Sequence, residues 1–251
     1  AEILVFDKKD GRWSLKSPFV APANQNRVAQ LLDIAHVSSE ARYPVKPDEL
    51  TRFELDKPKA SLTLGGVDLD FGGTDPINMN RYVKVGDTLH LVKDNFYHHL
   101  TAGATDYVDK KLLPDGARVN EIVIPGLKAV MSAEGKWTLT PTDSKADLNE
   151  LAFLWTTVRA IDVKRLQKPV QGESIHIGFV GGAAPVDFVI MQREPSLLLA
   201  RADLGLSYEI MPDMAGQLLN LPKPTPQPCP RLRTLMMNMR LSLSNRLGSH
   251  A

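Results

Sequence analysis

The stretch at residues 94–100, Asp-Asn-Phe-Tyr-His-His-Leu, holds the side chains of this chain that are best suited to chemistry. His98 and His99 could bind a metal ion, or one of them could act as a general base. Asp94 and His98 are spaced as neighbours on a helix, but adjacent helical residues point about 100° apart, so the two histidines do not converge. An Asp at a helix start is more often a cap. We predict no catalytic or metal-ligating residue, and a hydrolase using Asp94, His98 and His99 is the alternative.

Other chemical signatures are weak. Cys229 is the single cysteine, which excludes an internal disulfide and a thiolate metal cluster. No Gly-x-Ser-x-Gly nucleophile elbow occurs. The turn at residues 72–76 lacks the helix start and lysine of a phosphate loop. The glycines at 178, 181 and 182 do not fit a dinucleotide fingerprint. The sequence therefore predicts no cofactor.

Composition indicates a soluble globular protein. The chain has 251 residues, of which 43% are hydrophobic and 24% charged, with a net charge of +1. The last 21 residues contain four arginines and no Asp or Glu, and the rest of the chain is slightly acidic. This balance gives no argument for nucleic-acid binding. No stretch approaches the ~20 apolar residues of a membrane span.

An internal repeat dominates the organisation of the chain. Residues 11–15, Gly-Arg-Trp-Ser-Leu, return 124 positions later as Gly-Lys-Trp-Thr-Leu at 135–139. Each copy is followed by the same series of predicted elements: an amphipathic helix, a strand, two hairpins and a short helix. The predicted helices cover residues 26–36 and 145–158, and the short ones 94–100 and 212–219. The hairpins are predicted over 60–71 with 81–92, and over 174–190 with 196–210.

The sequence thus predicts an α+β fold of two similar repeats, each a mainly antiparallel sheet with hairpins packed against an amphipathic helix. We expect the first repeat at residues 1–103, a connector at 104–118 and the second repeat at 119–222. Residues 223–251 are expected to be a Pro-rich linker and a basic, disordered tail, with an amphipathic helix in the tail as the alternative. Trp13 and Trp137 should occupy equivalent buried positions.

Two local patterns refine this prediction. The Gly65-Gly66 turn should pair Leu64 with Val67 and Leu62 with Leu69, leaving Asp68 and Asp70 on the other face. A solvated strand face is the preferred interpretation of these carboxylates, and a cation site is the alternative. At 144–147, Ser-x-x-Asp has the spacing of a capping box for the second long helix.

The two copies differ at their beginnings. In the second copy, a strand at residues 119–124 precedes the strand at 127–131. In the first copy, residues 2–6 match that later strand, and no counterpart of 119–124 stands before them. We expect the natural protein to continue upstream into another strand, because a sheet lacking it would expose an unpaired edge.

The chain resembles the bacterial domain-of-unknown-function family 4340. The resemblance rests on residues 10–15 with Pro18 and on residues 55–64, Leu-Asp-x-Pro-x-Ala-Ser-Leu-Thr-Leu. It continues through residues 71–76, Phe-Gly-Gly-Thr-Asp-Pro, and 81–91, Arg-Tyr-Val-x-Val-Gly-Asp-Thr-x-His-Leu. It implies an N-terminal membrane helix, absent from this chain, and an extracytoplasmic α+β region. Some proteins of this kind are associated with ABC-type transporters related to gliding-motility systems, so the resemblance implies such a partner, and it carries no catalytic residue.

Three functions fit these observations, in decreasing order of preference. The first is a non-enzymatic periplasmic accessory or scaffold protein, anchored to the inner membrane, whose partner is a transporter subunit or another membrane protein. The second is the hydrolase at residues 94–99, and the third is a small-ligand or glycan-binding protein that uses the groove between the repeats. A cytoplasmic location is the alternative to the periplasm, because a single cysteine is compatible with both compartments.

Overall fold

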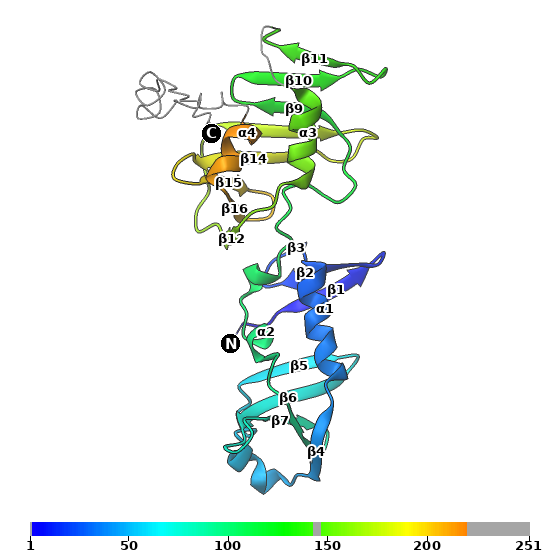
Figure 1. Cartoon of the computed structure of the whole chain (residues 1–251), viewed down its shortest axis with the longest axis vertical. Helices are drawn as coiled ribbons and strands as arrows, with labels where there is room; N and C mark the ends of the chain where they lie inside the picture. The colour runs from blue at the N-terminus through cyan, green and yellow to red at the C-terminus, as the bar shows by residue number, and fades with distance from the viewer. Residues whose placement is uncertain (1, 143–146, 220–251) are drawn as a thin grey trace, which may run out of the picture.

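A computed structural model describes residues 2–142 and 147–219 of the chain. Figure 1 shows an elongated molecule made of two parts that follow each other along the long axis. We call them the first unit, residues 2–107, and the second unit, residues 108–219. The predicted linker and tail at residues 223–251 lie outside the described residues.

The first unit opens with a small antiparallel sheet of three strands. These are β1 (Val5–Lys9), β2 (Arg12–Ser17) and β3 (Ala21–Pro22), in the order β1-β2-β3. Asp10 and Gly11 form the turn between β1 and β2 with positive φ angles of 50° and 78°. A tight hairpin requires this backbone conformation, and the Asp-Gly pair supplies it as predicted.

A five-stranded antiparallel sheet, in the order β4-β8-β7-β6-β5, forms the rest of the first unit. Its strands are β4 (Ser39–Pro44), β5 (Ala60–Leu64), β6 (Val67–Thr74), β7 (Arg81–Val85) and β8 (Thr88–Val92). Across the β5–β6 hairpin, Leu64 pairs with Val67 and Leu62 with Leu69. The predicted register is therefore confirmed.

The longest helix of the first unit is α1 (Gln25–Asp33), continued by η1 (Ile34–His36). The Asn24 side chain caps α1 by accepting a hydrogen bond from the backbone N–H of Arg27. Val28 and Leu31 are buried on one face, and α1 contacts β2. The amphipathic helix predicted for this region is confirmed. The short helices of this unit are η2 (Pro47–Phe53), α2 (Tyr97–Leu100) and η3 (Ala104–Tyr107).

The second unit is built on one antiparallel sheet of eight strands, in the order β11-β10-β9-β13-β14-β15-β16-β12. The strands are β9 (Val119–Ile124), β10 (Leu127–Met131), β11 (Trp137–Thr140), β12 (Asp162–Arg165), β13 (Ser174–Phe179), β14 (Val186–Gln192), β15 (Leu197–Arg201) and β16 (Leu206–Ile210). Two helices pack against each other in this unit, α3 (Leu148–Thr157) and α4 (Pro212–Leu218), and α3 also contacts β9.

The predicted α+β class with mainly antiparallel sheets and a few short helices is confirmed. Strand order agrees between the two units. The five-stranded sheet runs β4-β8-β7-β6-β5, and the eight-stranded sheet contains the series β12-β16-β15-β14-β13. In both units a two-stranded hairpin and a helix precede these strands along the chain.

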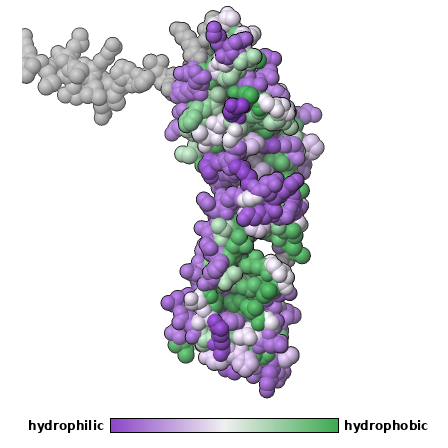
Figure 2. Space-filling view, turned by 90° about the vertical axis from the view of Figure 1, so that its right-hand side faces the viewer, coloured by the Kyte–Doolittle hydropathy of each residue, from purple (hydrophilic) through white to green (hydrophobic). Residues whose placement is uncertain are grey.

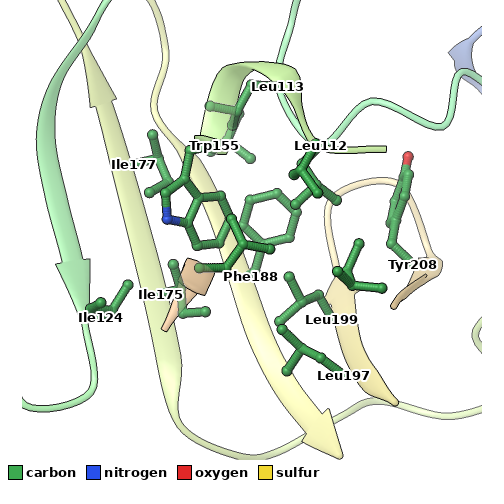
Figure 3. Close-up of a cluster of buried hydrophobic side chains, with 14 of the residues drawn as sticks. Leu112, Leu113, Ile124, Trp155, Ile175, Ile177, Phe188, Leu197, Leu199 and Tyr208 are labelled. Carbon is green, nitrogen blue, oxygen red and sulfur yellow. The ribbon is translucent and has the colours of Figure 1, made fainter. Parts of the chain in front are cut away.

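Each unit has its own apolar core. The large cluster of the second unit centres on Trp155, which is fully buried and lies 5.6 Å from Phe188 between ring centroids (Figure 3). The main cluster of the first unit includes Phe71, Phe96 and Tyr107. Trp13 and Trp137 pack against these clusters at only half-buried positions, which corrects the prediction that both are buried. The Trp137 Nε1–H donates to Asn149 at the surface.

Two helix starts differ from the prediction. Helix α3 begins at Leu148, and Asp147 is its N-cap, accepting hydrogen bonds from the backbone N–H groups of Asn149 and Glu150. Asp147 thus caps the helix itself instead of serving as the last member of a capping box; residue 144 lies outside the described residues. The helix predicted over residues 94–100 is reduced to α2, whose N-cap is Phe96.

The two units meet where the chain passes from the first to the second, beside the β3 segment of the first unit. Ala21 and Val108 belong to the core of the second unit, whereas Ala23 and Tyr107 belong to that of the first. The two segments are hydrogen-bonded to each other: the Asn24 N–H donates to the Tyr107 carbonyl, and the Asp109 N–H to the carbonyl of Pro22. Leu112 and Leu113 of the expected connector are buried in the second core. We call this crossing the joint.

Candidate functional site

The two histidines singled out by the sequence lie on α2 with their rings in tilted contact, which corrects the prediction that they do not converge. Their ring centroids are 3.8 Å apart, and His98 is exposed whereas His99 is partly buried. Burial, and then the nearby charges of His98 and Arg27, lowers the pKa of His99 below its ordinary value. The His99 ring is therefore neutral at pH 7. Its buried Nδ1 atom has no hydrogen-bond partner among the described residues.

Asp94, the third member of the hydrolase alternative, forms a salt bridge with Arg81. Its Oδ2 atom accepts from Nε and Nη2 of Arg81 at 2.8 and 2.6 Å. Arg81 is nearly buried, also donates to the Gly72 carbonyl at 2.6 Å, and lies 3.7 Å from the centroid of the Tyr97 ring. Asp94 is therefore neither the cap of α2 nor the hydrogen-bond partner of His98 that the spacing suggested. It holds β7 to the segment that leads into α2.

His99 is also tied into the fold through its backbone. The Tyr107 hydroxyl donates a short hydrogen bond to the His99 carbonyl. Burial raises the pKa of Tyr107 to about 12, so its hydroxyl stays protonated at neutral pH. Asp94 and the His99 carbonyl are thus bound within the fold, and among the described residues no hydroxyl or thiol is hydrogen-bonded to the His98 or His99 ring.

The paired carboxylates of the β5–β6 hairpin contact their cross-strand neighbours. Asp68 accepts from the Thr63 hydroxyl at 2.6 Å, and Asp70 accepts from that of Ser61 at 2.8 Å. Lys84 of β7 lies 3.5 Å from Asp70. This is the polar strand face predicted from the alternation of residues. In the part of the chain that the structure describes, no three His, Cys, Asp or Glu side chains gather as metal ligands.

The loop between β6 and β7 is the most distinctive surface feature, and its form was not predicted from the sequence. Asp75 is nearly buried, and its carboxylate accepts hydrogen bonds from the backbone N–H groups of Ile77, Asn78 and Asn80 at 2.9 to 3.0 Å. These bonds, that of Asn78 foremost, lower the pKa of Asp75. The loop is closed further by backbone hydrogen bonds between residues 75 and 80 and between residues 75 and 79.

This fixed loop presents two large apolar side chains to solvent. Ile77 is 85% exposed and Met79 is 63% exposed, the latter at a positive φ of 58°. We call residues 75–80 the apolar loop. The Gly-Gly-Thr-Asp-Pro sequence at residues 72–76 indicates a turn, but only the structure shows that the Asp75 side chain binds three backbone amides of the loop. Rigid apolar anchors of this kind suit contact with a protein surface better than catalysis.

A second polar cluster missed by the sequence analysis lies on the eight-stranded sheet. His176 of β13 lies opposite Asp187 of β14, with Nδ1 2.6 Å from the Asp187 carboxylate. Its Nε2 atom is 4.0 Å from Glu121 of β9. All three side chains are partly or fully exposed, and the contacts link adjacent strands. Strand alternation places each of these residues on the wet face, but their partners depend on strand order.

The described residues thus form an α+β protein with antiparallel sheets and a hydrogen-bonded loop that exposes apolar side chains. The family described as "Domain of unknown function (DUF4340)" matches residues 13–172, more than half of the chain. The protein belongs to this family, which confirms the resemblance. No curated protein matches the chain. No solved structure matches it either. Among the described residues, no helix is long and apolar enough to cross a membrane.

Proposed function

We propose that this protein is a non-enzymatic accessory or scaffold subunit on the periplasmic side of the bacterial inner membrane, where it contacts a transporter. A membrane helix of the full-length protein would hold it there. Membership of the family supports the proposal, because the resemblance implies extracytoplasmic proteins associated with transporters. The apolar loop is the observation that carries it.

The apolar loop combines two properties that protein contacts favour. Ile77 and Met79 offer apolar surface that is free to be buried by a partner. The three amide hydrogen bonds to Asp75 fix the loop before binding, so that little conformational entropy is lost on association. We therefore assign the contact with the partner to this loop.

The Asp94 carboxylate of the hydrolase alternative is engaged in the fold, which favours the scaffold over the enzyme. Asp94 binds Arg81, and His99 holds Tyr107 through its carbonyl. His98 is exposed but stacks on His99, with no hydroxyl or thiol as a hydrogen-bond partner among the described residues. A hydrolase that acts through a side-chain nucleophile would need that group within hydrogen-bond distance of its base.

We also infer that the two units are copies of one ancestral plan. Three features support the duplication: the recurring Gly-x-Trp motif, the common order of elements, and the same series of strands in both sheets. A scaffold with two copies offers equivalent loops on both units. The β14–β15 loop, which corresponds to the apolar loop, has the different sequence Arg-Glu-Pro-Ser at residues 193–196, so the proposed contact belongs to the first unit.

The proposal is tested by capture of the partner in the native host. The tagged full-length protein is cross-linked in cells, solubilised and purified, and the bound membrane proteins are identified by mass spectrometry. Replacing both Ile77 and Met79 by Ser should reduce recovery of the transporter subunit at least about tenfold, the loss expected when apolar anchors are removed. Folding should be unaffected, since exposed substitutions change stability by about 0.5 kcal/mol or less.

A matched control replaces two exposed apolar residues of the second unit, Phe153 and Met211, by Ser. This variant should still capture the partner. Equal loss in both variants would show that the contact is not specific to the apolar loop. A further variant, His98→Ala, should keep both capture and cellular function. If the His98→Ala variant folds but loses cellular function, the His98 side chain is required for activity, and an enzyme becomes the better interpretation.

A further inference from the structure

The first unit has an open strand position that the second unit fills. In the second unit, β9 lies between β10 and β13 and pairs antiparallel with both. By strand order and position in the chain, β10 corresponds to β1, and β13 corresponds to β5. Among the described residues, β1 and β5 are each the last strand of their sheet, so no strand joins the small sheet to the five-stranded one.

The residues beside the open position are more exposed than the corresponding residues beside β9, as expected if a strand is missing there. Beside β9, the inward side chains Leu127 and Ala129 of β10 and Ile175 and Ile177 of β13 are all buried. The inward side chains beside the open position are only partly buried: Leu4, Phe6, Ala60 and Leu62. The open position lies between β1 and β5 in Figure 1. At the same level along the vertical axis, Figure 2 shows apolar residues at the surface beside an opening.

The side-chain pattern of β9 indicates which kind of strand would fit the open position. Its inward residues Ile122 and Ile124 are 0% and 2% exposed, and Ile122 lies between Ala129 of β10 and Ile177 of β13. Its outward residues, among them Glu121, are only partly buried. The occupant is therefore a strand of about six residues with apolar side chains at alternate positions on the side of the core. Its backbone would pair with β1 on one edge and with β5 on the other.

We propose that this position is filled by a strand from the residues that precede Ala1 in the full-length protein. Strand β9 enters β10 through the two-residue turn Pro125-Gly126, with Gly126 at a positive φ of 82°. An equally short turn before Leu4 would place the preceding residues directly in the open position. A neighbouring segment has a high effective concentration there, and consecutive strands usually pair. This inference rests on the correspondence of strand order and not on the proposed function.

The test uses β9 itself as the probe. The sequence of residues 119–126 is placed directly before Leu4, in a Cys229→Ser background. Its control carries the same extension with proline at the positions copied from Ile122 and Val123, since proline cannot donate to a strand pair. We expect the amides of β1 and β5 that face the open position to exchange at least about tenfold more slowly than in the control. The melting temperature should rise by about 5 °C.

A second arm uses the natural residues upstream of Ala1, measured in the same way and then by structure determination. Protection of β5 by the natural segment supports the proposal even if the copied sequence fits poorly. Unchanged β5 exchange in both extended proteins overturns it. Light scattering distinguishes a second copy as the occupant: a dimer that already protects β1 and β5, and that persists after extension, also overturns it. A structure in which a strand of another protein fills this position would overturn the proposal as well.

Discussion

The Arg81 side chain of β7 contacts three other residues of the first unit at once. Its guanidinium bonds the Asp94 carboxylate and the Gly72 carbonyl, and it stacks on Tyr97, while its own backbone belongs to β7. Both members of the ion pair are largely buried, with 7% and 16% of their side chains exposed. Asp94 also keeps one buried oxygen, Oδ1, without a partner among the described residues. The arginine therefore neutralises a largely buried charge.

Replacing Arg81 by Met should destabilise the protein by about 3–5 kcal/mol, because it leaves a buried carboxylate unpaired. The matched control is Arg193→Ala, which breaks the exposed ion pair with Glu173 and should cost about 0–1 kcal/mol. Urea unfolding followed by circular dichroism measures both. Equal losses for the two variants would mean that the Arg81 pair behaves as a surface pair.

At the scale of single elements, Gly72 is required where η2 lies against β6. A Cβ atom at this position would lie 2.2 Å from the Phe53 carbonyl oxygen and 2.9 Å from a Leu55 side-chain carbon. A backbone oxygen cannot move aside as a flexible side chain can. We expect Gly72→Ala to cost about 1–3 kcal/mol, the range of overpacked sites.

The comparison for Gly72→Ala is Gly216→Ala, within α4, where nothing lies within 4 Å of the added Cβ. There alanine should stabilise the helix by up to about 1 kcal/mol. Thermal and urea unfolding of both variants should show a loss of stability for Gly72→Ala and a gain for Gly216→Ala. A neutral Gly72→Ala would show that η2 is free to move away from the sheet.

Elements with local signals were predicted well from the sequence. The hairpins at β1–β2 and β5–β6 follow from Asp-Gly and Gly-Gly turns, which fix register within a few residues. The helix at residues 94–100 was predicted too long. Its first residue in that range, Asp94, is held by Arg81 from 13 positions away, and a partner that distant leaves no local pattern. The burial of Trp13 and Trp137 was also overestimated, because it depends on how sheets and helices are arranged around the motif.

For the whole molecule, the two cores predict separate unfolding events. Phe71 is fully buried in the first unit and Phe188 in the second. Replacing either by Ala should cost about 3–5 kcal/mol. Hydrogen exchange should then accelerate in β5–β8 for Phe71→Ala and in β13–β16 for Phe188→Ala. The exposed Val67→Ala is the control, with little effect on either. Acceleration of both sheets by either core variant would show that the molecule unfolds as one body.

The joint has a mechanical consequence. Two segments of the chain lie side by side in it, and successive residues, Tyr107 and Val108, are packed in different cores. A single unpacked linker would let the units swivel, whereas two hydrogen-bonded segments packed in both cores oppose bending and twisting. Under load the molecule would act as a strut of fixed length. Fastened at one end, it would hold whatever its far end binds at a set height above the surface.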